Sequence, residues 1–121
     1  MGLSKIQKTV NNIVRIYNEE LGFCLDFCYG LSPEESGCVA ARWRQMHGIL
    51  RTGDYYALMD GFRRFFRLVH DSNYLMGRRN PYANGRRPFK ASLMWLMQKK
   101  NFVRILTGYY NARDFRARRL A

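Results

Sequence analysis

Apolar residues recur every three or four positions in several stretches of the chain, and this spacing places side chains on one face of an α-helix. The first stretch follows Ser4 and Gln7, which have the S-x-x-Q spacing of a capping box. Gly22 provides a place for this helix to end. The predicted apolar face consists of Ile6, Val10, Ile13, Val14, Tyr17 and Leu21.

A second helix is predicted to begin at Ser32-Pro33-Glu34-Glu35. Ser32 can cap, proline suits the first helical position, and Glu35 stands where a capping-box acid belongs. This helix runs to about Arg51, with Val39, Trp43, Met46 and Leu50 on one face.

Thr52-Gly53-Asp54 is predicted to close the second helix and to cap a third. The apolar stripe of the third helix is Leu58, Phe62, Phe65, Phe66 and Val69. Arg63, Arg64 and Arg67 occupy its other side, where the alkyl parts of their side chains can cover the core.

The remaining segments have less regular patterns. Phe23–Leu31 is short and apolar, so it is either a buried linker or a brief helical turn. Gly77–Pro88 contains two prolines, an Asn-Gly pair and four arginines, which predicts a loop that forms a small hairpin or stays mobile. Helices are predicted for Phe89–Met97 and for Asn101–Thr107.

These elements predict an all-α protein: a compact single-domain bundle of four to five main helices with an Arg-rich loop and a basic C-terminal tail. We expect residues 1–112 to form the domain and residues 113–121 a flexible tail. The 47% apolar content excludes a wholly disordered chain. No apolar run approaches the roughly 20 residues that span a bilayer, and no secretory signal follows the N-terminus, so we expect a cytoplasmic protein with no membrane partner.

Charge is divided unevenly along the chain. Residues 1–60 contain six basic and seven acidic residues, whereas residues 61–121 contain fifteen basic and two acidic residues. Folding does not require such a division, but a polyanion-binding surface does, because Lys and Arg that neutralise phosphates release condensed counterions. A merely solvated basic surface is the simpler alternative.

Little in the sequence indicates catalysis. No Walker-type loop, HExxH or GxSxG motif is present, and Asp71 and Asp114 are too few for a two-metal nuclease in the basic half. A zinc site can be drawn from Cys24, Cys28, Cys38 and His47, but its spacing fits no standard ligand pattern. We therefore expect a protein that is not an enzyme, with no metal or cofactor and with reduced cysteines in its interior.

Basic and aromatic residues alternate in and around the predicted Arg-rich loop. Arginine matches the geometry of phosphate, and aromatic rings can stack on unpaired bases. Phe89 is better explained as an anchor of the loop, and Trp95, Phe102 and Leu106 as core. The candidate DNA-binding residues are Arg78, Arg79, Tyr82, Arg86, Arg87, Lys90, Lys99, Lys100, Arg104, Arg113 and Arg116.

The second half of the chain contains a series of short motifs. It reads Ser72-Asn73-Tyr74-Leu75-Met76-Gly77-Arg78, Asn80, Phe89-Lys90-Ala91-Ser92, Trp95-Leu96-Met97, Asn101-Phe102, Arg104-Ile105-Leu106, Gly108 and Tyr110. Together with IVRIYN at residues 13–18, Leu31-Ser32 and Arg42, this series resembles the C-terminal region of phage and prophage replication initiators, also called replisome organisers. The resemblance covers roughly residues 10–112.

The resemblance implies a role in starting phage or mobile-element DNA replication in a bacterial host cell. Such regions contact opened DNA at an origin and recruit the replicative helicase or its loader. Family members commonly carry an N-terminal winged-helix domain as well, for which 121 residues leave no room. Origin recognition is therefore not carried over, and the chain is a stand-alone module, a fragment, or a small protein using the fold for another purpose. An alternative is an adaptor or inhibitor that binds a host protein without DNA.

Overall fold

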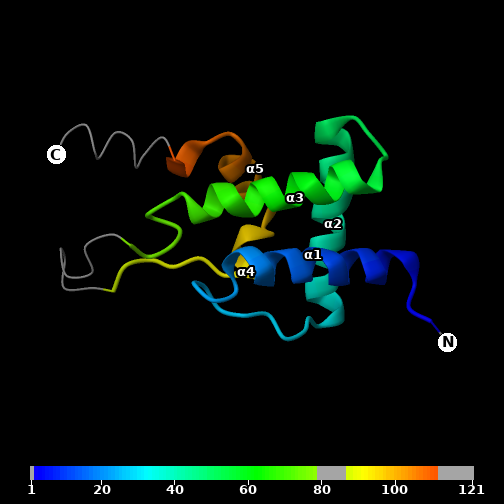
Figure 1. The fold of residues 1–121 in the computed structure, drawn as a ribbon, viewed down its shortest axis with the longest axis horizontal. Helices are drawn as coiled ribbons and strands as arrows, with labels where there is room; N and C mark the ends of the chain where they lie inside the picture. The colour runs from blue at the N-terminus through cyan, green and yellow to red at the C-terminus, as the bar shows by residue number, and fades with distance from the viewer. Residues whose placement is uncertain (1, 79–86, 112–121) are drawn as a thin grey trace.

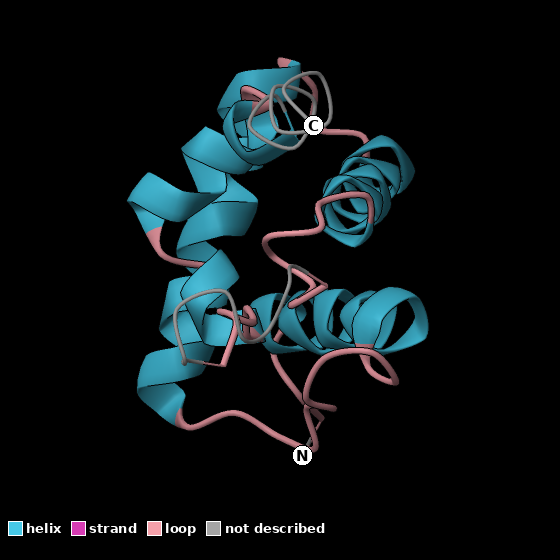
Figure 2. Ribbon diagram, turned by 90° about the vertical axis from the view of Figure 1, so that its left-hand side faces the viewer, coloured by secondary structure: helices cyan, strands magenta, loops and turns pink. Residues whose placement is uncertain are grey.

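The computed structural model describes residues 2–78 and 87–111, and this part of the chain is helical without strands. Figures 1 and 2 show helices joined by loops and turns. Residues 109–111 are also helical. The bounded helices are α1 (Lys5–Leu21), α2 (Pro33–Leu50), α3 (Tyr55–His70), α4 (Leu93–Leu96) and α5 (Lys99–Leu106). The all-α prediction is confirmed, whereas residues 79–86 of the predicted Arg-rich loop and the predicted tail lie outside the described residues.

Helix α3 is the centre of the arrangement, because it packs against α1, α2 and α5. In Figure 1, α1 and α3 run across the view in the same direction and α2 crosses them. The short α4 packs against α5. All five residues of the predicted α3 stripe are completely buried: Leu58, Phe62, Phe65, Phe66 and Val69.

Aromatic rings join the helices in this core. The ring centroids of Tyr17 and Phe66 are 5.6 Å apart in an edge-to-face contact between α1 and α3. Phe102 on α5 lies 4.7 Å from the ring of Phe65 on α3. Such pairs add about 0.5–1.5 kcal/mol each to the free energy of burying the rings. The second half of the chain is thereby fixed to the first.

The two predicted capping boxes differ. At α2, the Ser32 hydroxyl accepts a hydrogen bond from Glu35 N, and the Glu35 carboxylate accepts one from Ser32 N, so this box is confirmed. At α1, Ser4 accepts from Gln7 N, but the Gln7 side chain donates to Asn11 Oδ1 instead. The prediction of a reciprocal box at Ser4 is therefore half right.

The end of α2 also departs from the prediction. Arg51 takes the left-handed conformation (φ 53°) that closes the helix, a position where glycine is usual, and Gly53 follows two residues later. Leu50 is exposed and does not belong to the buried face. Asp54 caps α3 as predicted, accepting a hydrogen bond from Tyr56 N.

Two segments were predicted wrongly. Residues 23–31, named here the aromatic linker, are largely exposed and non-helical after a turn at residues 22–24, although Leu25 is buried. Phe89–Ser92 is not helical, and α4 begins only at Leu93, where the Ser92 hydroxyl accepts a hydrogen bond from Trp95 N. The predicted helix at Asn101–Thr107 is confirmed as α5, which begins two residues earlier.

Candidate nucleic-acid interface

Two segments that contain the ends of the predicted Arg-rich loop and the residues next to them lie against each other. We call residues 72–78 and 87–91 the loop base. Ala91 N donates a hydrogen bond to Leu75 O over 2.9 Å, which holds the second segment extended beside the first. Gly77 takes a left-handed conformation (φ 70°) next to Lys90, where a Cβ atom would lie 3.4 Å from the Lys90 Cβ. This tertiary pairing explains why Phe89–Ser92 does not continue as helix.

A cluster of four aromatic rings supports the loop base. Phe89 stacks on Tyr74 with centroids 5.0 Å apart, and it lies 4.9 Å from the ring of Trp95. Tyr110 completes the cluster, at 5.6 Å from Tyr74 and 5.8 Å from Trp95. Two of these pairs are stacked and two are tilted or edge-on, and together the contacts show that Phe89 anchors the loop base to the fold, as the sequence indicated. Phe102 is buried in the core, whereas Leu106 and Trp95 are half-buried against it.

Three of the candidate DNA-binding residues lie on the loop base. Arg78, Arg87 and Lys90 are exposed, and Arg78 also donates a hydrogen bond from Nη1 to His70 O over 2.8 Å. This bond ties the guanidinium to the end of α3 and leaves its other donors available. Five other candidates lie outside the described residues: Arg79, Tyr82, Arg86, Arg113 and Arg116.

Helix α5 carries the other described candidates. Lys99 and Lys100 are exposed in its first turn, which contains no acidic residue, and the N-cap Gln98 makes no side-chain capping bond. Cations at a helix N-terminus oppose the helix dipole, at a cost of about 0.3–1 kcal/mol each, whereas an anion bound there is favoured. Arg104 is half-buried and lies over the ring of Tyr109, 5.1 Å from its centroid. The structure thus places candidate cations on two elements, the loop base and α5.

The arginines of α3 are engaged differently. Arg63 bridges Glu19 and Glu20 of α1, with both N–O distances 2.8 Å, and Arg67 also contacts Glu20 at 3.4 Å. Arg64 pairs with Asp60 on its own helix. Hydrogen bonds from Arg63 and Arg15 lower the pKa of Glu19. The carboxylates of Glu19 and Glu20 in turn raise the pKa of Arg63. Arg63 and Arg67 therefore join α3 to α1, whereas Arg64 does not. Periodicity could not reveal this because the partners of Arg63 on α1 are 43 and 44 residues away.

The ion pairs within the described residues all lie on α1 and α3. The sequence between Asp71 and Asp114 contains no acidic residue at all. The positive charge of the loop base and α5 is therefore not neutralised by ion pairs in the described structure. This difference between paired and unpaired cations is the main electrostatic feature of the candidate interface.

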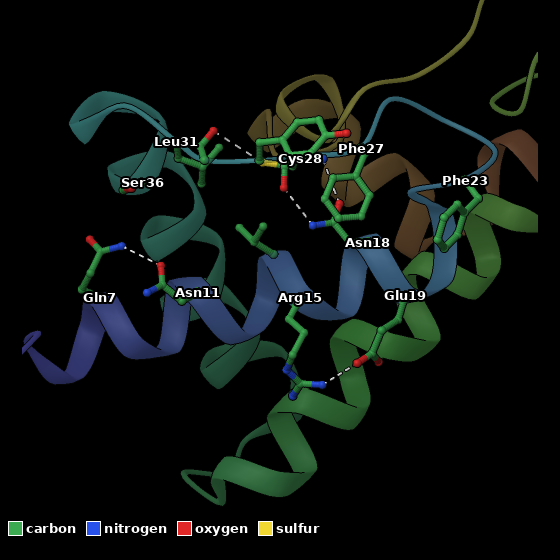
Figure 3. A pocket seen from close by; sticks show the side chains of 13 residues that line it. Gln7, Asn11, Arg15, Asn18, Glu19, Phe23, Phe27, Cys28, Leu31 and Ser36 are labelled. Carbon is green, nitrogen blue, oxygen red and sulfur yellow. Dashed lines mark hydrogen bonds and ion pairs between the residues drawn. The ribbon is translucent and has the colours of Figure 1, made fainter.

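Consecutive residues of α1 fasten the aromatic linker, a feature that sequence reasoning missed. Tyr17 donates its hydroxyl to Asp26 O over 2.7 Å. The Asn18 amide accepts from Cys28 N and donates to Cys28 O, both over 2.8 Å, as Figure 3 shows. Burial, followed by the carboxylate of Asp26, raises the pKa of Tyr17 to about 12. Only the resemblance of IVRIYN to the family pattern singled out this pair of residues beforehand.

The cysteines are free thiols and only partly fit the prediction of an interior location. Cys24 is exposed, while Cys28 and Cys38 are half-buried. Burial raises the pKa of the Cys28 thiol, and Cys38 Sγ donates to Met97 O. Across residues 2–78 and 87–111, no group of three or more His, Cys, Asp or Glu side chains is arranged to hold a metal ion. In the same residues, no helix combines the length and apolarity needed to cross a membrane.

Comparison of the chain with protein-family models, with curated proteins and with solved structures finds no match.

Proposed function

We propose that this chain is a non-enzymatic DNA-binding accessory protein of phage or mobile-element replication, which contacts DNA near its Arg-rich loop and recruits the replicative helicase or its loader. The observation that carries the DNA part is the set of unpaired cations on the loop base and α5, in a sequence free of acids from residue 72 to residue 113. The replication part rests on the resemblance of residues 10–112 to replisome organisers.

Phosphate binding needs cations that are exposed and not already neutralised. Arg87 and Lys90 meet this condition, because both are exposed on a backbone held by the Ala91–Leu75 hydrogen bond. Lys99 and Lys100 add cations beside the N–H groups of a helix start, where an anion is favoured. The rings of Tyr74, Phe89 and Tyr110 are stacked on one another and are half-buried or buried, so the proposal rests on contacts to phosphate rather than on base stacking.

The test is a titration with matched single-stranded and duplex oligonucleotides at two salt concentrations, with fluorescence anisotropy as the measure of binding. The double variant Arg87→Ala/Lys90→Ala should weaken binding, and the slope of log affinity against log salt should become shallower by about 1 per lost phosphate contact. A quadruple variant of Arg78, Arg79, Arg86 and Arg87 to Ala should have a larger effect. Arg64→Ala is the matched control, because this exposed arginine is already paired with Asp60.

If both multiple variants bind DNA as the unchanged chain does, the loop region is not the contact. A second candidate function is an adaptor or inhibitor that binds a host protein without DNA. The exposed aromatic rings of the linker favour a protein partner of some kind. No measurable affinity for either oligonucleotide at low salt would favour this second candidate over the first.

A further inference from the structure

The aromatic linker presents a row of rings to solvent. Phe23 and Tyr29 are 91% and 93% exposed, and Phe27 between them is 40% exposed. The ring centroids of Phe23 and Phe27 are 6.4 Å apart, and those of Phe27 and Tyr29 are 4.7 Å apart. Contiguous exposed apolar surface of this kind marks interaction sites more often than scattered single residues do.

The backbone beneath these rings is held in place. The Tyr17 and Asn18 side chains bind the backbone at Asp26 and Cys28, on either side of Phe27. A segment that is already ordered loses little conformational entropy when a ligand binds, so more of the contact energy appears as affinity. Exposed rings on a fixed backbone therefore favour a docking role over a loosely packed linker.

Hollows lie on both sides of the linker, and we call them together the linker groove. One, of about 700 Å³, is bounded by α1 and by the aromatic rings, and Figure 3 looks into it. The other, of about 390 Å³, lies between the linker and the start of α4. Together the two hollows give room for several side chains of a peptide that crosses the linker.

The charges around the linker groove are mainly negative. Three carboxylates line it, those of Glu19, Asp26 and Glu35. Glu19 is already paired with Arg15, the one basic residue in the lining, and with Arg63, so the negative charge that no ion pair of the described residues neutralises comes from Asp26 and Glu35. Between Arg15 and Arg42 the sequence contains five acidic residues and no Lys or Arg. An anionic ligand would be repelled here, so the rings are unsuited to stacking on nucleic-acid bases, whose phosphates need nearby cations.

We infer that the linker groove is a docking site for a cationic peptide segment of a protein partner, with Lys or Arg side chains alternating with apolar or aromatic anchors. Cations would meet the carboxylates of Asp26 and Glu35 and the faces of Phe27 and Tyr29, while apolar anchors would cover Phe23. This inference deepens the proposed function and rests on its recruitment part. It gives the protein partner a surface separate in sequence from the cations assigned to DNA.

The probe is a random peptide library selected on the immobilised full chain, with the variant Phe23→Ser/Tyr29→Ser used for counter-selection. The selected peptides should be enriched in Lys, Arg and apolar residues. A synthetic peptide of the selected sequence should bind the ring variant at least about tenfold more weakly, as expected for loss of hot-spot residues. A second variant, Asp26→Asn/Glu35→Gln, should weaken binding and reduce its salt dependence, because it removes two carboxylates. The fold should be retained, since the glutamine side chain introduced in place of Glu35 can still cap α2.

Two matched controls separate the groove from general stickiness. Tyr56→Ser removes another ring that is 82% exposed, and Asp60→Asn removes a carboxylate on α3; neither should change peptide binding. Selection of acidic peptides, or of none that depend on the rings, would overturn the inference. Weaker binding of single-stranded DNA by the ring variant would also overturn it. Retained DNA binding by this variant, together with loss of the peptide, is the expected result and keeps the two proposals distinguishable.

Discussion

Asn18 forms two hydrogen bonds with the backbone of Cys28, so that a helix side chain pairs with an extended segment much as a neighbouring strand would. Asn18→Ala removes both bonds and leaves a half-buried N–H and C=O without a partner. The free energy of unfolding should fall by about 1–3 kcal/mol. Urea denaturation measures this, with Asn11→Ala as the control. Asn11 is exposed and its amide bonds to the Gln7 side chain, so its loss should change stability by less than about 0.5 kcal/mol.

The hydroxyl of Tyr17 gives a prediction at alkaline pH. Its pKa is raised from 10.0 to about 12, so ionisation is harder in the folded chain than in the unfolded chain. The associated stabilisation is complete below about pH 10 and is lost as the pH rises through about 12. Tyr17→Phe should lower the free energy of unfolding by about 1 kcal/mol at neutral pH. Its deficit relative to the unchanged chain should shrink across this alkaline window. Tyr29→Phe, which removes a hydroxyl from an exposed ring, should show no deficit at neutral pH.

The bridge between Arg63 and Glu19 predicts a shift that NMR can measure. In Arg63→Gln the pKa of the Glu19 carboxyl should rise toward its ordinary value, because the largest cause of its depression is removed. A carboxyl group with a depressed pKa stabilises the fold when the pH is above the pKa of the unfolded chain. This stabilisation is lost as the pH falls through the lower pKa of the folded chain. The stability difference between the two chains should therefore narrow in acid. Arg64→Gln, which removes the partner of Asp60, should leave the Glu19 titration unchanged.

Glycine substitutions should have opposite effects at two positions. Gly77→Ala forces a Cβ into a left-handed conformation beside Lys90 and should destabilise the fold by about 1–2 kcal/mol. Gly37→Ala, in the interior of α2 with open space around the new methyl group, should stabilise it by about 0.5–1 kcal/mol. Thermal unfolding monitored by circular dichroism measures whether each substitution lowers or raises the stability of the fold. If Gly77→Ala were neutral, the loop base would not be held as described.

The sequence predicted the elements that depend on local chemistry. Ser32 and Glu35 define the start of α2 because each bonds to the other's backbone within one turn. The stripe from Leu58 to Val69 is buried as its spacing indicated. The predicted helix at Phe89–Met97 begins late because Ala91 bonds to Leu75, sixteen positions earlier, and helical periodicity carries no information about such a partner.

The candidate sites show the same limit. Arg63, Arg64 and Arg87 look alike in sequence, yet two are paired with acids and the third is exposed on the loop base. Phe23 and Tyr29 look like core residues because they are aromatic and lie among apolar neighbours. Their exposure follows from the hydrogen bonds that Tyr17 and Asn18 make to the linker backbone. Polar contacts between distant residues thus decide which apolar residues stay outside.

The fastening of the linker also changes how the chain should meet a protease. Exposed Phe and Tyr side chains in a non-helical segment are the sites that a chymotrypsin-like enzyme cleaves first, provided that the backbone can enter its active site. Here the backbone at residues 26 and 28 is bound to the last turns of α1. Cleavage then requires those turns to open, so the linker amides should exchange their hydrogens together with the end of the helix. A segment with the composition of a cleavage site becomes part of the cooperative unit that contains α1.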